Sequence, residues 1–518
     1  MYIEPNSTIK IIYQCPLDKS YENTLWFESV ADQTNYFQNT LGGYTFTKNS
    51  YQRVKKGVMR IAKSAEEMYD CNYLAFRNIS FGSKWFYAFI DKIEYVNNVT
   101  SEITYTIDVI QTWHFDYYME ECFVEREHSV TDEIGDNIVD EGLDTGEYVS
   151  DGIDYYPSSA LNPSYQLVVW ATFDYSYTNV GGYHEITGGT ELFSGLVPIS
   201  FPLTHAGISE AIAWLNDVPV IKLSGIVCIT ILPYTASAPQ GTITYAKKDN
   251  NLERKTGYVK NKKLYTYPYN FLYVTNNHGK CAVFRYEFFS TQNCTFNVFC
   301  DMNPSATEVI WPKYYKGSAD NYDEAIELNG FPQCAFNVDS YKAWLAQNLS
   351  SIAMSSLGLT SFFANEMANG VTNVAGGLTP LGMLAIIRQE VSGIVHTFMP
   401  PQSKGNQGNN TLIALDKMKF GFMHKHITKE YATIIDDYFS MYGYATKKLK
   451  YPNRSSRPEW NYVKTIGCKI RSGIPSDDAI AIEGLYDKGI RFWKNPAHIG
   501  DYTFDNSPSN NNPNIPES

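Results

Sequence analysis

Residues 343–403 contain only three charged side chains, Glu366, Arg388 and Glu390, among 61 residues. That share is far below the 19% of charged residues in the whole chain. The uncharged run from Met367 to Ile387 is interrupted by glycines and by Pro380, which break a continuous spanning helix. The segment is therefore too apolar for a solvated loop and too broken for a simple transmembrane span.

The pattern predicts two helices around a glycine-rich bend. The first would run from about Ala343 to Leu357. In the second, Thr379 would cap the helix, Pro380 would take the first helical position, and the helix would end before Pro400. Two uses fit this pattern: a buried helical hairpin in an ordinary core, or a hairpin that is stored in an assembly and released into a membrane. Isolated carboxylates suit the second use, because loss of their charge lowers the cost of insertion.

The candidate membrane-inserting residues are the large apolar side chains of this segment. They are Leu349, Ile352, Phe362, Phe363, Met367, Leu378, Leu381, Met383, Leu384, Ile386, Ile387, Val391, Ile394, Val395 and Phe398. In the second helix, Gln389, Ser392, His396 and Thr397 would lie opposite the apolar stripe. The candidate acid-sensing residues are Glu366, Glu390 and His396.

The rest of the chain favours β structure, because aromatic residues reach 15% and 40 residues are Tyr. Residues Lys84–Val96 and Ser101–Phe115, joined by a turn at Asn97-Asn98, predict a β-hairpin. The second half alternates apolar and polar residues, whereas the first is apolar on both faces, as in a central strand. Residues 155–330 predict short strands and turns, with a hairpin turn at 276–280.

Helical periodicity is clearer near the C-terminal end. Residues 428–444 predict a helix with one apolar face made of Tyr431, Ile434, Ile435, Tyr438 and Phe439. A second helix is predicted from Ser476 to Lys488, with Gly489 as its stop.

Charge patterning gives two further segments. The formal net charge of −13 argues against a general nucleic-acid binder, which needs a cationic surface. Residues 131–154 hold nine carboxylates and no Lys or Arg. They predict a solvated acidic surface; a Ca²⁺ site is the alternative, although the spacing does not match an EF-hand. Residues 247–263 carry seven positive and two negative side chains and predict a solvated or subunit-contact loop, with a phosphate-binding patch as the alternative.

Residues that could support chemistry give weak signals. The nine Cys are odd in number and form no CxxC, which indicates buried thiols, and the N-terminus lacks the layout of a signal peptide. His424 and His426 would share one face of a strand, but the sequence positions no third ligand, so no metal or cofactor is predicted.

The common catalytic motifs are absent and we expect no enzyme, although a glycosidase needs only two carboxylates. A sugar-binding protein (lectin) is a further alternative function, because aromatic-rich β proteins often bind sugars by stacking.

Several runs carry a family resemblance. Residues 76–116 include FYAFIDKIEYV and QTWHFD, and residues 121–148 begin with ECFVEREH. Together with CPLDKSYENTLWFES (15–29), NKKLYTYPYNFL (261–272) and SGIPSDDAIAIEGLYDKGIRFW (472–493), they resemble the distal tail knob proteins of small short-tailed bacteriophages with protein-primed genomes.

The resemblance implies a mainly β, ring-forming protein in which N- and C-terminal parts combine into a tail-tube-like β-barrel domain. Residues 1–154 and 411–518 would form the tube domain, residues 155–342 the middle β-rich knob domains, and residues 343–410 the membrane-active loop. Six copies would form a tube at the distal end of the tail, with apolar loops that plug the lumen and later make a pore in the host cytoplasmic membrane. The implied partners are the collar or proximal tail tube, a separate cell-wall hydrolase at the tip, and genomic DNA in transit.

The alternative is a β-rich receptor- or glycan-binding tail protein in which residues 343–403 are only core.

Overall fold

The computed structural model describes residues 7–49, 57–79, 82–156, 166–172, 196–202, 205–218, 220–232, 240–246, 252–255, 257–301, 303–331, 333–335 and 419–507. The chain divides into two compact units. Unit 1 contains residues 1–147, 250–269 and 427–518, and unit 2 contains residues 148–249 and 270–426. Unit 1 therefore combines both ends of the chain with a short piece from its middle.

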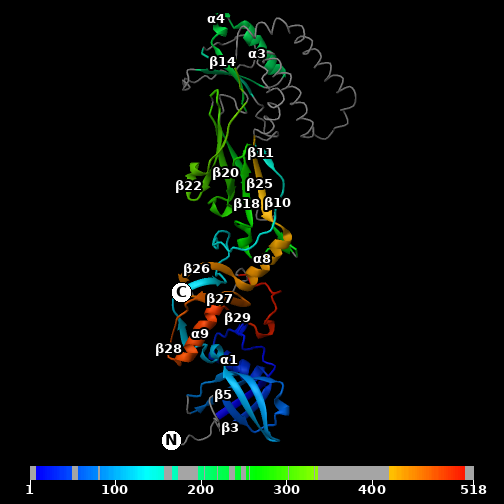
Figure 1. The fold of residues 1–518 in the computed structure, drawn as a ribbon, viewed down its shortest axis with the longest axis vertical. Coiled ribbons are helices and arrows are strands. Elements are labelled where there is room, and N and C mark those ends of the chain that lie inside the picture. Colours follow the sequence, from blue (N-terminus) through cyan, green and yellow to red (C-terminus); the bar gives the residue numbers. More distant parts are fainter. Residues whose placement is uncertain are drawn as a thin grey trace, which may run out of the picture. The chain divides into compact units, whose positions relative to one another are not determined.

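Unit 1 begins with a six-stranded antiparallel sheet of N-terminal residues (Figure 1). The strand order is β3 (Gly43–Asn49), β1 (Ser7–Tyr13), β5 (Cys71–Asn78), β6 (Phe86–Asn97), β7 (Thr100–Ile107) and β4 (Val58–Ile61). Successive strand residues point to opposite faces. Ile11 and Leu74 join one buried cluster while their neighbours Ile12 and Tyr73 join another. Both faces of β1 and β5 are therefore covered.

The predicted hairpin is confirmed, with β6 between β5 and β7 and with Asn97 paired to Thr100 across the turn. Its second strand is shorter than predicted, because β7 ends at Ile107 and the helix α2 (Val109–Trp113) follows. Asp108 causes the change. Its buried carboxylate accepts a hydrogen bond from the Gln111 N–H at 3.0 Å, which caps the helix.

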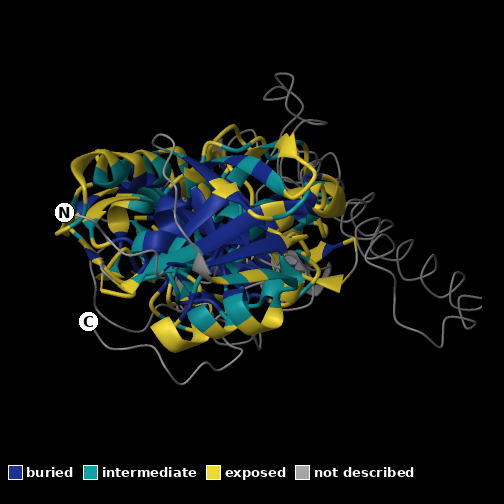
Figure 2. Cartoon of the chain, turned by 90° about the horizontal axis from the view of Figure 1, so that it is seen from below, coloured by how far each residue is buried: buried dark blue, intermediate teal, exposed yellow. Residues whose placement is uncertain are grey.

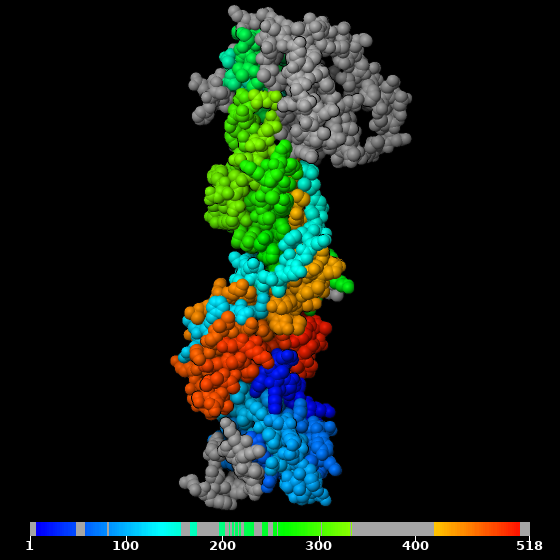
Figure 3. Space-filling view, viewed as in Figure 1, coloured from blue at the N-terminus to red at the C-terminus, as the bar shows by residue number. Residues whose placement is uncertain are grey.

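The second sheet of unit 1 joins the two ends of the chain. Its order is β2 (Thr24–Leu25), β29 (Ile490–Trp493), β27 (Trp460–Ile466), β9 (Cys122–Glu127) and β26 (Tyr444–Lys450). The N-terminal strand β9 thus lies between two C-terminal strands, and Figure 3 shows the cyan and orange residues side by side. A smaller pair, β8 (Tyr117–Met119) with β28 (Ile470–Ser472), repeats this arrangement.

Two helices flank this sheet. Helix α8 (Lys429–Tyr442) is capped by Thr428, and α9 (Ser476–Lys488) ends at Gly489 with φ +98°, so both predicted helices are confirmed. The predicted apolar face of α8 is wrong at Ile434, which is 65% exposed. The buried stripe is Ala432, Ile435, Asp436, Phe439 and Ser440, and Ile434 is rotated away from it. In Figure 2 the strands are mostly dark blue, whereas the helices show yellow outer sides.

Unit 2 contains three larger sheets. The first orders β10 (Tyr148–Ser150), β25 (Phe420–Ile427), β18 (Asn270–Thr275) and β19 (Cys281–Phe284), and β11 (Asp154–Tyr156) also pairs with β25. The second orders β13 (Val197–Pro202), β12 (Gln166–Ala171), β14 (Ile226–Leu232) and β24 (Gln333–Ala335). The third orders β15 (Gln240–Ala246), β20 (Asn293–Cys300), β21 (Glu308–Tyr315) and β22 (Ser318–Asp320), with β23 (Ile326–Leu328) on β21.

The core of unit 2 is aromatic and aliphatic, with Trp170, Leu272, Phe296 and Phe422 in one buried cluster. The hairpin predicted at 276–280 is confirmed by the pairing of β18 with β19. Sequence reasoning missed the helices α3 (His205–Asp217) and α4 (Val220–Leu223). The buried residues Ala211, Trp214, Leu215 and Val218 have helical spacing that lay hidden among strand-like neighbours.

The mainly β fold class is confirmed. The four-part division of the chain stays a prediction. Of the helices that the structure describes, none combines the length and apolar character needed to cross a membrane. Cys15, Cys71, Cys122, Cys228, Cys300 and Cys468 are buried thiols, as expected, whereas the expectation is wrong for Cys281, which is exposed.

Candidate functional site

The predicted membrane segment lies outside the described residues. This holds for all fifteen candidate inserting residues, from Leu349 to Phe398, and for Glu366, Glu390 and His396. Their roles stay predictions.

The acidic and basic segments of the sequence meet in unit 1. The expectation that both are solvated is wrong for four buried side chains, Asp132, Glu141, Arg254 and Lys263. Asp132, Glu141 and Lys263 lie at the contact between the two segments, whereas Arg254 pairs with Asp436 of α8. A buried charge is tolerated when an opposite charge or a hydrogen bond compensates it. Lys263 and Glu141 compensate each other's buried charge in this way. Lys262 and Glu133 add an exposed ion pair between the same two segments, with nitrogen and oxygen 3.1 Å apart.

Glu141 is the most highly coordinated of these groups. Its fully buried carboxylate accepts hydrogen bonds from the side chains of Arg126 and Lys263 and from the Ala445 N–H at 2.9 Å. Lys263 Nζ also donates to the Val139 carbonyl at 2.7 Å. Burial lowers the pKa of Lys263, and the charge of Glu141 opposes that shift. One carboxylate thus fixes β9, β26 and the 3-10 turn at Lys262–Tyr265 to one another.

Two neighbouring carboxylates accept hydrogen bonds from neutral donors, and one of them, Asp436, is also ion-paired to Arg254 at 3.3 Å. Asp132 accepts from the Tyr444 hydroxyl at 2.5 Å and the Lys262 N–H at 3.1 Å. Asp436, on α8, accepts from the backbone N–H groups of Lys260 at 2.8 Å and Asn261 at 2.9 Å. Burial raises the pKa of both carboxyl groups. These contacts hold segments together that lie far apart in the sequence.

In unit 2, the structure brings His424 and His426 together with a carboxylate that sequence reasoning did not connect to them. Their rings are 5.6 Å apart on one face of β25. Asp151 precedes β11, and its oxygens lie 3.5 Å from His426 Nε2 and 4.0 Å from His424 Nε2. The ligand atoms of the three residues lie within 4.8 Å of one another. The signal was not readable from sequence, because about 270 residues separate Asp151 from the histidines.

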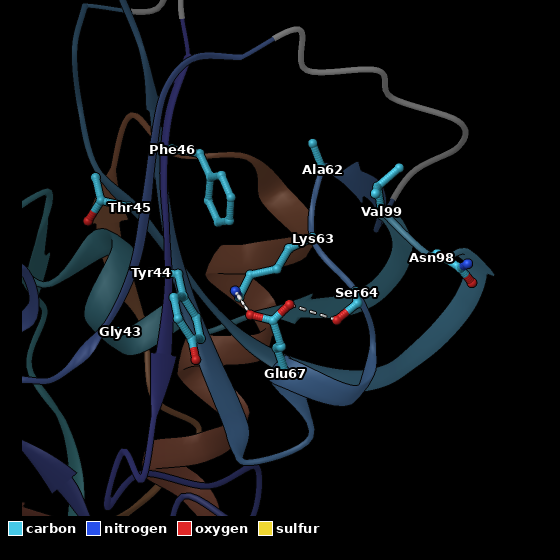
Figure 4. Close-up of a pocket in the computed structure, with 10 residues that line it drawn as sticks. All are labelled: Gly43, Tyr44, Thr45, Phe46, Ala62, Lys63, Ser64, Glu67, Asn98 and Val99. Carbon is cyan, nitrogen blue, oxygen red and sulfur yellow. Dashed lines mark hydrogen bonds and ion pairs between the residues drawn. The ribbon is translucent and has the colours of Figure 1, made fainter.

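A hollow of about 460 Å³ lies at the edge of the N-terminal sheet, lined by residues of β3 and of the turn after β4 (Figure 4). Lys63 points into it, with its Nζ 4.1 Å from the centre of the Tyr44 ring and ion-paired to Glu67. Ser64 Oγ donates to Glu67 at 2.9 Å. The polar groups at this wall therefore satisfy one another and do not form a nucleophile with its base.

Two models of known protein families together match most of the chain. Residues 239–507 match the model of the C-terminal domain of tail knob protein gp9 from Bacillus phage phi29. Residues 5–118 match the model of the N-terminus of caudoviral major tail proteins.

Relatives matched over nearly their full length are also tail knob proteins. The tail knob protein gp9 of Bacillus phage B103 is 25% identical over 96% of this chain and 98% of its own length. The corresponding protein of Bacillus phage phi29 is 22% identical, with the same coverage. Among solved structures, the tail knob protein gp12 of bacteriophage C1 superposes with a TM-score of 0.61 at 16% identity, and covers 96% of this chain and 99% of that one. This last likeness concerns the fold alone.

Proposed function

Since the chain belongs to the family of phi29-type tail knob proteins, we propose that it builds the distal end of a phage tail as a homohexameric tube. The observation that carries the proposal is the similarity to tail knob proteins over 96% of the chain. The protein is a structural component of the virion tail. In the tube, one end would join the collar or proximal tail tube, and the other would carry the cell-wall hydrolase.

Genomic DNA would pass through the lumen without specific binding. An acidic protein suits this task, because a cationic wall would retain the phosphate backbone. The net charge is −13, and the exposed side of residues 133–147 carries Glu133, Asp136, Asp140, Asp144 and Glu147. We place this side at or near the lumen.

The apolar segment 343–403 would plug the lumen and then enter the host cytoplasmic membrane. Burial of each large apolar side chain is worth about 1.5–3 kcal/mol relative to full exposure. Six copies exposed to water would therefore be strongly unfavourable, so the segments would leave the tube only where a membrane receives them.

The test is leakage of dye from liposomes exposed to purified full-length protein. Leu384→Asp with Ile394→Asp puts two charges on the predicted apolar stripe and should abolish leakage while assembly stays intact. Gln389→Asp with Ser392→Asp is the matched control, because it adds the same charges to the opposite, polar face. Leakage by the stripe variant at the wild-type rate would remove the segment from the membrane step.

The rival proposal keeps the segment as core of a receptor- or glycan-binding protein. It is separated by replacing residues 343–403 with a short Gly-Ser linker. If the linker variant assembles but no longer permeabilises liposomes, the membrane role holds. If it fails to fold, the core role holds.

We propose no enzymatic activity, since the relatives are named as tail knob proteins. Release of fragments from peptidoglycan or capsule glycan, abolished by a single Asp or Glu substitution, would contradict this.

A further inference from the structure

We propose that Asp151, His424 and His426 bind one divalent transition-metal cation of the zinc class. The cation would fasten the short strands β10 and β11 to β25. In Figure 1 these strands lie beside one another, and β18 flanks β25 on its other side. None of the three ligands belongs to residues 343–403, so the site does not depend on the proposed pore.

The spacing of the three ligands fits a metal better than a direct ion pair. His426 Nε2 is 3.5 Å from Asp151 Oδ1, which is longer than the 2.7–3.2 Å of an ordinary hydrogen bond. Tetrahedral zinc with bonds of about 2.0–2.2 Å separates its ligand atoms by roughly 3.4 Å. The distance from His426 Nε2 to Asp151 Oδ1 already has that value. The 4.0 Å from His424 Nε2 is measured to the other carboxylate oxygen, Oδ2, and one ligand atom from each residue lies within 4.8 Å of the others, so a bound cation would draw the three side chains closer together.

A neighbouring tyrosine orients one of the ligands. Tyr286 Oη lies 2.5 Å from His424 Nδ1, the ring nitrogen on the far side from Asp151. With its proton on Nδ1, His424 donates to the tyrosine oxygen and presents the lone pair of Nε2 to the metal. Ligating histidines usually make such a hydrogen bond through their second nitrogen. Tyr286 and His424 are both buried, so the arrangement is built into the core.

The ligand set selects the class of metal. Two imidazoles and one carboxylate suit Zn²⁺, Co²⁺ or Ni²⁺, whereas Ca²⁺ and Mg²⁺ prefer oxygen ligands alone. The side chain of Asp151 is 36% exposed and that of His426 14% exposed, so one side of the site faces solvent. Water can supply the fourth ligand there.

Two short strands gain from the cross-link. β10 and β11 have three residues each and lie at the edge of their sheet. Strands this short contribute few backbone hydrogen bonds, so a metal bond to β25 should add noticeably to their attachment.

The test uses tag-free full-length protein, treated with EDTA and dialysed. Titration with Zn²⁺ alone should give one ion per chain by calorimetry and by elemental analysis, and should raise the thermal unfolding temperature. Co²⁺ in place of Zn²⁺ should give the visible absorption bands of a four-coordinate nitrogen and oxygen site.

Substitutions identify the ligands. Asp151→Asn changes an accessible side chain without changing its size and should lose the tight Zn²⁺ site, as should His426→Gln. Tyr286→Phe should weaken binding by about 10–100-fold, the usual effect of removing such a supporting hydrogen bond. His278→Gln removes an exposed histidine of the same unit and should bind as wild type.

Two outcomes would overturn the proposal. One is the absence of stoichiometric Zn²⁺ binding by the wild type. The other is equal binding by the wild type and by Asp151→Asn, which would place the metal elsewhere.

Discussion

At the scale of single residues, the structure buries histidines in neutral form. His128 Nδ1 accepts from the Tyr462 N–H at 2.7 Å, so Nε2 carries the proton and donates to the Ser440 carbonyl at 3.1 Å. Burial lowers the pKa of His128 well below its ordinary value of 6.5, and Arg457 adds to the shift. Burial likewise lowers the pKa of His114 to about 4.

These shifts predict a loss of stability in mild acid. A histidine with a lowered folded-state pKa contributes fully above pH 6.5, and its contribution falls as the pH drops toward the folded pKa. His114 alone should cost about 2 kcal/mol of unfolding free energy between pH 7 and pH 5. Asp108 acts in the opposite direction. Burial raises its pKa to about 6, so the stability that its protonated form contributes is lost as the pH rises from 3.8 to about 6. Urea unfolding at pH 7 and pH 5 measures this loss. In His114→Gln, the part of the loss that comes from His114 should be absent.

His278→Gln is the control, because His278 is exposed. Equal pH dependence in wild type and His114→Gln would contradict the assignment.

A second residue-scale prediction concerns Glu141. Glu141→Gln leaves Arg126 and Lys263 without the charge that both share, so unfolding free energy should fall by about 3–5 kcal/mol. Glu133→Gln makes the same chemical change at an exposed pair with Lys262 and should cost less than about 1 kcal/mol. Chemical denaturation measures both, and similar losses would show that burial does not decide the effect.

At the scale of elements, glycines set where the helices end. Gly443 follows α8 with φ +65° and ψ −153°, a conformation that only glycine adopts easily. A Cβ atom there would lie 2.1 Å from the Glu127 carbonyl oxygen of β9. Helix α8 can therefore pass directly into β26 only because this position has no side chain.

Gly443→Ala should lower the unfolding free energy by at least about 2 kcal/mol, because both the backbone and the contact with β9 are strained. Gly484→Ala is the matched control within α9. Apart from the backbone of its own helix and its chain neighbours, no heavy atom lies within 4 Å of its added Cβ, so alanine should stabilise the helix by about 0.5–1 kcal/mol. Thermal unfolding reads out both changes, and a neutral Gly443→Ala would contradict the strain argument.

At the scale of the whole molecule, unit 1 leaves an apolar row on the sheet that joins the chain ends. Phe123 of β9 pairs with Leu449 of β26 on one side and with Ile466 of β27 on the other. Residues directly opposite in neighbouring strands point to the same face. The three side chains are 38%, 70% and 56% exposed, respectively. We expect the neighbouring copy of the proposed ring to cover this row.

The whole-molecule prediction follows from that row. Native mass spectrometry should find six copies in the wild-type assembly. Phe123→Asp with Leu449→Asp should yield folded monomers, whereas Ile480→Asp with Val99→Asp changes two other exposed apolar residues and should leave the ring intact. A monomeric wild type would contradict the proposed tube.

The sequence by itself determined the features that depend on residues close together in the chain. The hairpin of β6 and β7, the helices α8 and α9 and the apolar character of residues 343–403 follow from periodicity, turn residues and composition, which act between near neighbours in the chain. Only the tertiary structure decided which distant segments meet. It placed β9 between β27 and β26, neutralised Glu141 with Lys263, and brought Asp151 to His424 and His426. Such pairings depend on strand register and on the burial of charge, and both arise only when segments separated by more than a hundred residues pack together.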